Sequence, residues 1–511
     1  MCLLSGGLVF FLGRDFFPSV DAGQFRLHVR GRAGLRIEET ARLVDQVEQE
    51  IRQEVPRKEV DTVLDNIGLP YSGINLSYSN AGTIGTSDAE ILVSLKPGHR
   101  PTEEYVHHLR GELSRKFPGV EFFFQPADIV SQILNFGQPT PIDIQLSGQN
   151  YPQNYVIAQQ IANRLRHVPG AVDVHVQQLM SNPTLHLDVD RVRAQQVGLT
   201  QRDVAQNLLV SLSSSFQTSP TFWVNPKNGV SYNLAVMSPQ YRVDSLQALM
   251  NTPISGANTA APQVLANLAT VTPATTPAVV SHYNVAPAVD VYASVDGRDL
   301  GGVADDTSEI VKSFQKQLPR GTQMHIRGQV DTMQSSYLGL LIGLLMSIVL
   351  VYLLIVVNFQ SWLDPFIIIT ALPGALAGIL WILFLTHTTL SVPALTGAVM
   401  CMGVATANSI LLISFARERM AEGLDAVRAA VEAGYTRMRP VVMTALAMII
   451  GMLPMALGIG EGGEQNAPLG RAVIGGLTVA TVATLLLVPV VFSIFHERRV
   501  KHEISTSPKE S

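Results

Sequence analysis

Five long apolar runs without a charged residue constrain this chain more than any other feature. They are Tyr337–Val357, Phe366–Leu385, Val392–Ala416, Pro440–Gly460 and Ala472–Phe495. Each has 20 or more residues, enough to cross about 30 Å of hydrocarbon as an α-helix. Buried helices of a large soluble protein are the alternative, but five such runs between residues 337 and 495 disfavour it. The sequence therefore predicts a five-helix transmembrane block over residues 337–495.

Composition and charge agree with a membrane protein that has a large folded part outside the bilayer. Of the 511 residues, 47% are hydrophobic and 15% are charged, whereas soluble domains carry about 25% charged residues. The net charge is -5, and the 10 basic and 10 acidic residues after Asp331 cancel. The acidic surplus before residue 332 argues against a nucleic-acid surface. The two cysteines, Cys2 and Cys401, show no metal-binding spacing, so neither a metal nor a cofactor is expected.

Basic residues gather on one side of the predicted spans. The stretch Arg417–Arg439, read as a loop, holds five arginines, and the tail adds Arg498, Arg499 and Lys501. The loop Glu461–Gly470 holds no basic residue. Since positive loops stay inside, we expect the C-terminus in the cytoplasm and the residues before Tyr337 outside it.

The first apolar run, Cys2–Leu12, is only 11 residues long. It would span about 16 Å as a helix, half of a membrane. A signal peptide is one interpretation, but no charged residues precede the run. We favour the outer end of a truncated transmembrane helix over residues 1–13, which would make the chain the continuation of an upstream sequence.

Between the apolar segments, helical and strand periods alternate twice. The first series predicts the order β-α-β-β-α-β from Gln24–Arg30, Ile37–Val55, Ala89–Leu95, Pro101–Lys116 and Val120–Gln125, with one strand given no residues. The second is predicted from Ile142–Leu146, Tyr155–His167, Val172–Val176, Val289–Val295, Gly302–Gln317 and Thr322–Arg327. A long insertion interrupts it, with a strand at Thr184–Val189, a helix at Thr200–Leu212 and an exposed hairpin at Ser213–Val236.

No catalytic constellation is visible. The histidines at 107, 108, 167, 175, 186, 282 and 325 do not have metal-ligand or triad spacing, and surface or core packing is the default interpretation for each. Every Asp, Glu, Lys and Arg between Tyr337 and Phe495 is expected in a loop or at a span edge, so no carboxylate is expected at the membrane midplane. The polar residues inside the spans include Thr406, Asn408, Ser409 and Thr444, for which interhelical hydrogen bonding is the simplest interpretation.

Several motifs make the chain resemble the C-terminal half of the resistance-nodulation-division (RND) efflux permeases of the acriflavine-resistance type. These motifs are Phe359–Pro365, Gly403–Leu411, Arg437–Thr444 with Gly451 and Pro454, Gly475–Gly476 with Pro489, and Leu187–Arg191 with Gly198–Leu199. They occur in the family's order and spacing over nearly the whole chain.

The resemblance implies an α+β membrane protein. Two split βαβ (ferredoxin-like) porter subdomains, at residues 18–130 and 139–331, would precede the transmembrane helix bundle at 337–495 and a cytoplasmic tail at 496–511. The insertion at about 213–236 would be a docking hairpin that reaches a neighbour in a homotrimer. Implied partners are the N-terminal half of the permease, a periplasmic adaptor, an outer-membrane channel and the lipid bilayer, with no nucleic acid.

The implied function is proton-driven export of small amphipathic compounds across a bacterial inner membrane. The coupling carboxylates belong to the half of the family's length that this chain does not match. Arg437 and Thr444 occupy positions that support the proton relay, and Asn408 is retained, whereas Ala407 replaces an expected lysine. A transport-incompetent fragment or structural subunit, and a lipid-moving or protein-translocating relative, remain alternatives.

The resemblance also indicates a substrate path. It implicates Tyr71 and Tyr78, in a loop rich in Gly, Ser and Asn, and Phe122 and Phe124, which alternate with Phe123 and so share one strand face. Core packing explains the two phenylalanines equally well.

Overall fold

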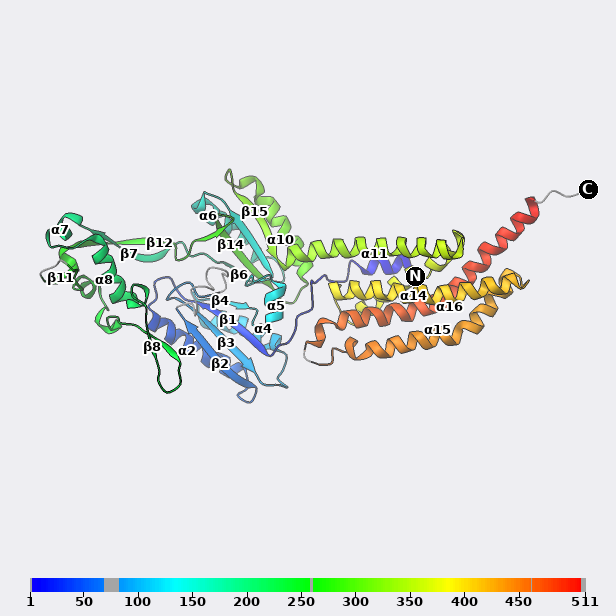
Figure 1. Ribbon diagram of the computed structural model, residues 1–511, viewed down its shortest axis with the longest axis horizontal. Coiled ribbons are helices and arrows are strands. Elements are labelled where there is room, and N and C mark those ends of the chain that lie inside the picture. Colours follow the sequence, from blue (N-terminus) through cyan, green and yellow to red (C-terminus); the bar gives the residue numbers. More distant parts are fainter. Residues whose placement is uncertain (1, 69–81, 258–260, 461, 507–511) are drawn as a thin grey trace, which may run out of the picture. The chain divides into compact units, whose positions relative to one another are not determined.

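The computed structural model describes residues 2–68, 82–257, 261–460 and 462–506 (Figure 1). The chain divides into two compact units, one of Met1–Leu179 with Val279–Ser511 and the other of Met180–Ala278. Tyr71 and Tyr78 lie outside the described residues.

The first sheet of the larger unit is four-stranded and antiparallel. Its elements in chain order are β1 (Gln24–Arg30), α2 (Ile37–Glu54), β2 (Val60–Ile67), β3 (Asp88–Leu95), α4 (Thr102–Lys116) and β4 (Glu121–Gln125). The strands lie side by side in the order β2-β3-β1-β4. Because Phe25, Leu27 and Val29 alternate with polar residues along β1, one face of the sheet is apolar, and the buried stripes of α2 and α4 pack on it.

A second sheet repeats this arrangement. Its elements are β5 (Ile142–Ser147), α6 (Tyr151–Leu165), β6 (Ala171–Val176), β13 (Ser281–Tyr283), β14 (Ala286–Val295), α10 (Leu300–Phe314) and β15 (Gln323–Gly328). Strand β14 lies between β5 and both β6 and β13, and β15 pairs with the other edge of β5. Ile142, Ile144 and Leu146 join α6 and α10 in a separate apolar core. A short helix, α5 (Ile129–Leu134), connects the two sheets.

The smaller unit is the insertion, and it is larger than its hairpin. It holds β7 (Asn182–Val189), α7 (Arg191–Gln196), α8 (Gln201–Ser213), β8 (Thr221–Val224), β9 (Ser231–Leu234), α9 (Leu246–Met250), β10 (Pro253–Ile254), β11 (Gln263–Val264) and β12 (Ala269–Thr276). Strands β7 and β12 pair along their whole length and close the unit. All eight residues of β8 and β9 are exposed, and their turn closes with a hydrogen bond from the Gly229 amide to the Asn225 carbonyl (2.8 Å).

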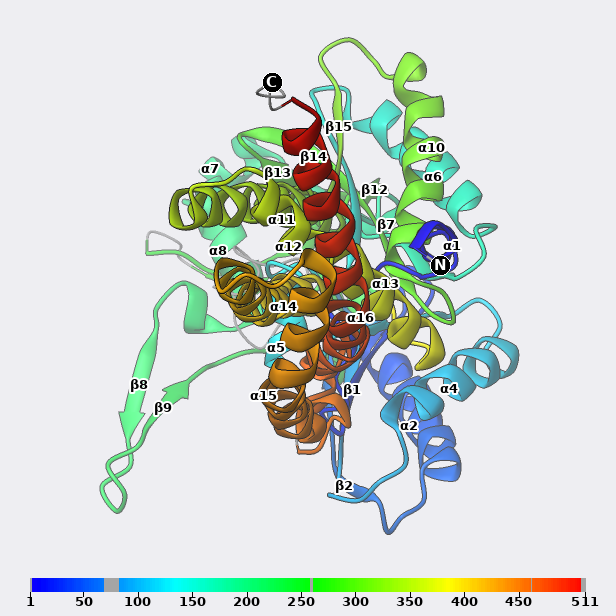
Figure 2. The ribbon, with the colours of Figure 1, turned by 90° about the vertical axis from the view of Figure 1, so that its right-hand side faces the viewer.

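The membrane half is helical, as expected. The described residues contain five helices that are long and apolar enough to cross a membrane. The elements are α11 (Gln329–Phe359), α12 (Leu363–Ile369) with α13 (Leu372–Leu385), α14 (Val392–Ala421), α15 (Ala426–Ala456) and α16 (Ala467–Thr506), and α1 (Cys2–Leu8) packs beside α13. Figure 2 views the bundle end-on, with α14, α15 and α16 adjacent. The break between α12 and α13 precedes Pro373, which cannot donate the next helical hydrogen bond.

The arginine-rich stretch is not the loop that the sequence interpretation assumed. Helix α14 runs to Ala421 and α15 begins at Ala426, so only four residues connect them. Alanine-rich sequence after Asp425 favours helix, and the Asp425 carboxylate caps α15 by accepting a hydrogen bond from the Arg428 amide (3.2 Å). The arginines therefore lie on the ends of two helices.

Candidate functional site

Two of the predicted relay residues meet between α14 and α15. The Thr444 hydroxyl donates to the Asn408 side-chain oxygen (3.3 Å) as well as to the Val441 carbonyl (2.9 Å). Asn408 is 5% exposed. Seven residues further along each helix, the Arg437 guanidinium lies 4.8 Å from the centre of the Phe415 ring. Because the two helices run antiparallel and seven residues make two turns, all four side chains lie on one face.

A second polar contact joins α14 to α16. The buried hydroxyls of Ser409 and Thr484 lie 3.1 Å apart, and Ser409 also donates to the Ala405 carbonyl (3.0 Å). Sequence reasoning identified Ser409 but missed Thr484, which is 0% exposed and lies in the predicted span Ala472–Phe495. Ala407 lies on the exposed side of α14, away from both contacts.

A charged cluster closes the end of the bundle at which the arginines lie. Asp364, 2% exposed, has its carboxylate 3.3 Å from Arg417 and 3.3 Å from the His496 ring. Arg417 also donates to the Phe359 carbonyl (3.0 Å). Through these contacts one carboxylate ties together α12, α14, α16 and the end of α11.

Outside the membrane block, the predicted phenylalanines face the core of the first sheet. Phe124 is 6% exposed and belongs to that core, and Phe122 packs against it. Each also lines a cavity: Phe122 borders one of about 340 Å³, and Phe124 one of about 640 Å³. The larger cavity also touches Gln329, the first residue of α11, and Glu464, in the connection between α15 and α16. It therefore extends from the membrane block into the first sheet.

Arg110 of α4 borders both cavities. Its guanidinium lies 5.1 Å from the centre of the Phe124 ring and forms ion pairs with Asp173 of β6 (2.8 Å) and with Asp296, the residue after β14 (2.6 Å). Burial alone would lower the pKa of Arg110, but the two carboxylates raise it. Arg110 thus links the two sheets on the side where their helices lie.

The helix-free faces of the two sheets meet in a buried polar layer, which we call the seam. Its central members are His28, Arg30, Asp88, Phe123 and His175. Phe123 is stacked between the rings of His28 (4.3 Å between centroids) and His175 (3.7 Å). Arg30 crosses from the first sheet to donate to the Val176 carbonyl of the second (3.1 Å).

Contacts of the buried Asp88 carboxylate with a histidine and an arginine hold the seam together. Asp88 lies 3.3 Å from both His28 and Arg30, and burial, which raises a carboxyl pKa, is outweighed by these two groups, so that the pKa of Asp88 falls to about 2. Burial, and then the charge of Arg30, lowers the pKa of His175 to about 3, so its ring is neutral.

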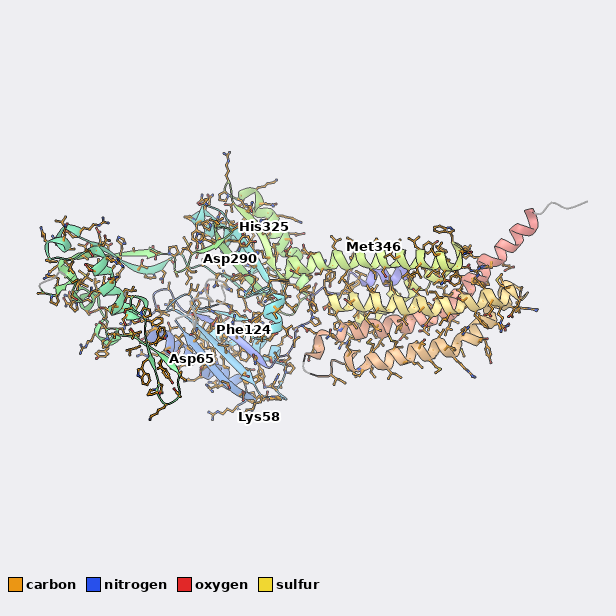
Figure 3. The ribbon with its side chains drawn as sticks, in the orientation of Figure 1. Lys58, Asp65, Phe124, Asp290, His325 and Met346 are labelled. Atoms are coloured by element: carbon orange, nitrogen blue, oxygen red, sulfur yellow. The ribbon has the colours of Figure 1, made fainter. Side chains whose placement is uncertain are left out.

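Sequence reasoning missed the seam. It treated His175 as an ordinary histidine, used Phe123 only to place Phe122 and Phe124 on one strand face, and did not consider His28. A signal was present: Arg26, His28 and Arg30 alternate with apolar residues along β1. Alternation alone, however, indicates a solvent-facing side, and only the second sheet buries these residues. Figure 3 shows Phe124 in the first sheet and Asp290 in the second.

Comparisons with known proteins complete the description of the chain. A family model described as the AcrB/AcrD/AcrF family matches residues 1–496. The cobalt-zinc-cadmium resistance protein CzcA of Cupriavidus metallidurans is 26% identical over 505 residues, covering 97% of this chain and 46% of CzcA. The multidrug resistance protein MdtC of Proteus mirabilis is 27% identical over 491 residues, covering 94% of this chain and 45% of MdtC.

Among solved structures, an X-ray structure of a heavy metal efflux pump superimposes with a TM-score of 0.81 at 26% identity. The match covers 97% of this chain and 49% of that one. The chain thus spans about half the length of the relatives that it matches.

Proposed function

This chain belongs to the AcrB/AcrD/AcrF family of RND efflux permeases, and we propose that it forms the C-terminal half of a proton-driven exporter of small amphipathic compounds. The family match over residues 1–496 carries the proposal. The two sheets with their helices would be the ferredoxin-like porter subdomains (18–130 and 139–331), and α11 to α16 would form the second half of the transmembrane domain.

The cavity of about 640 Å³ supports an amphipathic cargo. Apolar side chains line it, including Phe17, Phe25, Val106, Phe124 and Leu134, and it also contains carboxylates. A mixed lining of this kind suits a molecule that has an apolar body and a polar group. Because the cavity begins beside Gln329 at the membrane block, cargo dissolved in the outer part of the bilayer could enter it directly.

Asn408, Thr444 and Arg437 would support a proton relay whose carboxylates come from the N-terminal half. The contact between Asn408 and Thr444 fixes α14 against α15, so a charge change on a facing helix could move both. Ala407 is exposed on α14, as a residue facing that other half would be. Without a lysine there, the relay must compensate its carboxylate charges in another way.

The relay is tested in a permease assembled from this chain and an N-terminal half. Thr444→Ala should lower dye export severalfold without lowering the protein level, because it removes the hydrogen bond to Asn408. Thr478→Ala is the matched control, since the exposed Thr478 hydroxyl bonds only within its own helix, to the Ile474 carbonyl. Wild-type export by Thr444→Ala would refute the role of Thr444. The chain expressed alone should export nothing; if adding the N-terminal half restores no export, the transport-incompetent alternative is favoured.

The proposed location is a bacterial inner membrane, with the porter region periplasmic and the C-terminus cytoplasmic. The arginines on the facing ends of α14 and α15 support this orientation. A protease added outside spheroplasts should cleave in the insertion and leave the C-terminus intact; cleavage of the C-terminus under these conditions would contradict the orientation.

The hairpin β8–β9 would dock on a neighbouring protomer in a homotrimer. Phe222, Trp223, Tyr232 and Leu234 are all at least 47% exposed, which is costly for large apolar side chains unless a partner covers them. An adaptor and an outer-membrane channel would complete the assembly.

Export of divalent metal ions is the second candidate, favoured by the names of the relatives CzcA and the nickel and cobalt resistance protein CnrA. Within the described residues, no group of three or more His, Cys, Asp or Glu is placed to hold a metal ion. Resistance to ethidium and to cobalt, zinc and cadmium salts should be compared in one host strain with and without the permease. Protection against the metals alone would overturn the amphipathic cargo.

A further inference from the structure

Asp143 is a buried carboxyl that neither the relay nor the cavities use. It lies on β5 between Ile142 and Ile144, which point into the apolar core. By alternation its side chain points to the opposite, polar face of the second sheet. It is 0% exposed. A carboxyl at this depth is stable as an anion only if other groups compensate its charge.

The described residues provide Asp143 with no hydrogen bond. Neither of its carboxyl oxygens has a partner. Arg327, its neighbour across β15, donates instead to the Gln145 side-chain oxygen (3.1 Å), and its guanidinium lies 4.2 Å from the centre of the Tyr283 ring. The nearby cation is therefore committed elsewhere, and Asp143 lacks the contacts that would hold an anion.

Asp290 on β14 differs from Asp143 because its carboxylate accepts hydrogen bonds. The side-chain amides of Gln145 (2.9 Å) and Gln178 (2.8 Å) both donate to its carboxylate. Burial raises the pKa of Asp290 as well, but these two hydrogen bonds favour its charged form and offset part of that rise. Burial, and then the charge of Asp290, raises the pKa of Asp143 well above its usual value. Of the two acids, Asp143 is the one that keeps a proton.

The remaining groups around Asp143 connect it to the seam. Tyr292 lies directly opposite it on β14 and packs edge-on against His175, whose ring stacks on Phe123 of the first sheet. The titratable and charged groups that face this region from the packed elements are Asp290, Tyr292, His175, His325, Arg327, Tyr151, Arg30 and His28. Of these, only Asp290 and Arg327 act directly on the Asp143 charge.

The two sheets have separate apolar cores, and the bonds across the seam are polar, as in the bond from Arg30 to the Val176 carbonyl. Polar interfaces between separately cored domains permit relative motion. Opening the seam would bring water toward Asp143 and allow it to ionise. A divalent cation is a poor alternative occupant, because the described residues offer no third acidic, histidine or cysteine ligand here.

We propose that Asp143 is a proton-binding site in the extracytoplasmic half, which holds a proton while the seam is closed and releases it when the seam opens. Closing the seam then takes up one proton from the side on which the sheets lie. Because the closed state binds the extra proton, a low pH favours closure, and raising the pH through the Asp143 pKa favours opening. The inference rests on the proposed function only for placing the sheets outside the cytoplasm.

Infrared difference spectroscopy on the purified full chain tests the protonation itself. Wild type minus Asp143→Asn at neutral pH should show the C=O stretch of one protonated carboxyl, and wild type minus Asp188→Asn, an exposed control, should show none. The wild-type band should disappear as the pH is raised. A difference spectrum with only ionised carboxylate at Asp143 would overturn the proposal, whatever the result of transport assays.

The link to motion is tested with spin labels on Ser114→Cys and Asn163→Cys, exposed positions on α4 and α6, in a background lacking Cys2 and Cys401. The distance between the labels should lengthen as the pH rises in the wild type and stay short at every pH in Asp143→Asn. Asp143→Leu should give the same short distance as Asp143→Asn. It should also keep the fold if the buried amide of Asp143→Asn disrupts it, because a neutral carboxyl without a hydrogen-bond partner can be replaced by an apolar group. A distance that responds to pH equally in both variants would refute the link.

Discussion

Helices α13 and α16 approach each other closely at Gly378 and Gly475, and this approach leads to a prediction for Gly378→Ala. A β-carbon built at Gly378 would lie 2.8 Å from the Val479 Cβ, and nearer still to the Gly475 carbonyl oxygen. The reverse holds at Gly475, whose β-carbon would lie 2.7 Å from the Gly378 oxygen. The two backbones therefore approach in a way that only glycine on both helices allows.

The free-energy cost of Gly378→Ala follows from the steric overlap of the added methyl group with α16. Carbon atoms pack best at about 3.5 Å or more, so relieving the Val479 contact alone requires a separation of roughly 0.7 Å, and the nearer Gly475 oxygen requires more. Overpacking of this kind destabilises by about 1–3 kcal/mol. A cooperative unit of about 150–250 residues, such as the helical block Gln329–Thr506, loses about 2–4 °C per kcal/mol, so a cost near 2 kcal/mol lowers the Tm of this block by about 4–8 °C. Thermal unfolding of the purified chain in detergent, followed by tryptophan fluorescence, measures it.

Gly339→Ala on α11 is the matched control. No heavy atom lies within 4 Å of a β-carbon built at Gly339, and alanine is the better helix former by about 1 kcal/mol. Its Tm should be unchanged or slightly raised. If Gly378→Ala unfolds at the wild-type Tm, or if both variants lower Tm equally, the inferred close packing of α13 against α16 is wrong.

Three further predictions concern the residues outside the membrane block. Arg110→Met should open the boundary between the two cavities and leave Asp173 buried without its cation. We expect the unfolding free energy to fall by a few kcal/mol and a cysteine placed at Phe122 to be labelled faster. Arg115→Met, at an exposed position, is the control. Lowering the pH from 6.5 toward 3 should destabilise the wild type more than His175→Phe, because the unfolded chain takes up a proton that the buried ring refuses; identical pH slopes in unfolding experiments would contradict this. Trp223→Ala in the exposed hairpin should weaken trimers of the assembled permease in native mass spectrometry without changing Tm, whereas undiminished trimers would remove the hairpin from the interface.

Sequence periodicity predicted most elements of the two sheets and missed those with weak patterns. Strand β1 was found because Phe25, Leu27 and Val29 alternate with polar residues. Strand β2 was not assigned because the apolar residues of Val60–Ile67 do not alternate regularly with its polar ones, and the strand lies at a sheet edge. Helix α6 starts at Tyr151, four residues before the predicted start, since Pro152 is compatible with a first helical turn.

The sequence by itself determined what depends on local composition. It determined the five apolar spans, because crossing hydrocarbon requires some 20 apolar residues in a row, and it identified the contact partners Asn408 and Thr444 as polar groups inside spans. The tertiary structure decided which face of each strand matters. It turned Phe122 and Phe124 toward the core and Phe123 toward the seam, and it buried Asp143 without a partner. The environment of Phe123 depends on a second sheet, whose His175 lies 52 residues further along the chain. No local pattern specifies what such a separate surface will cover.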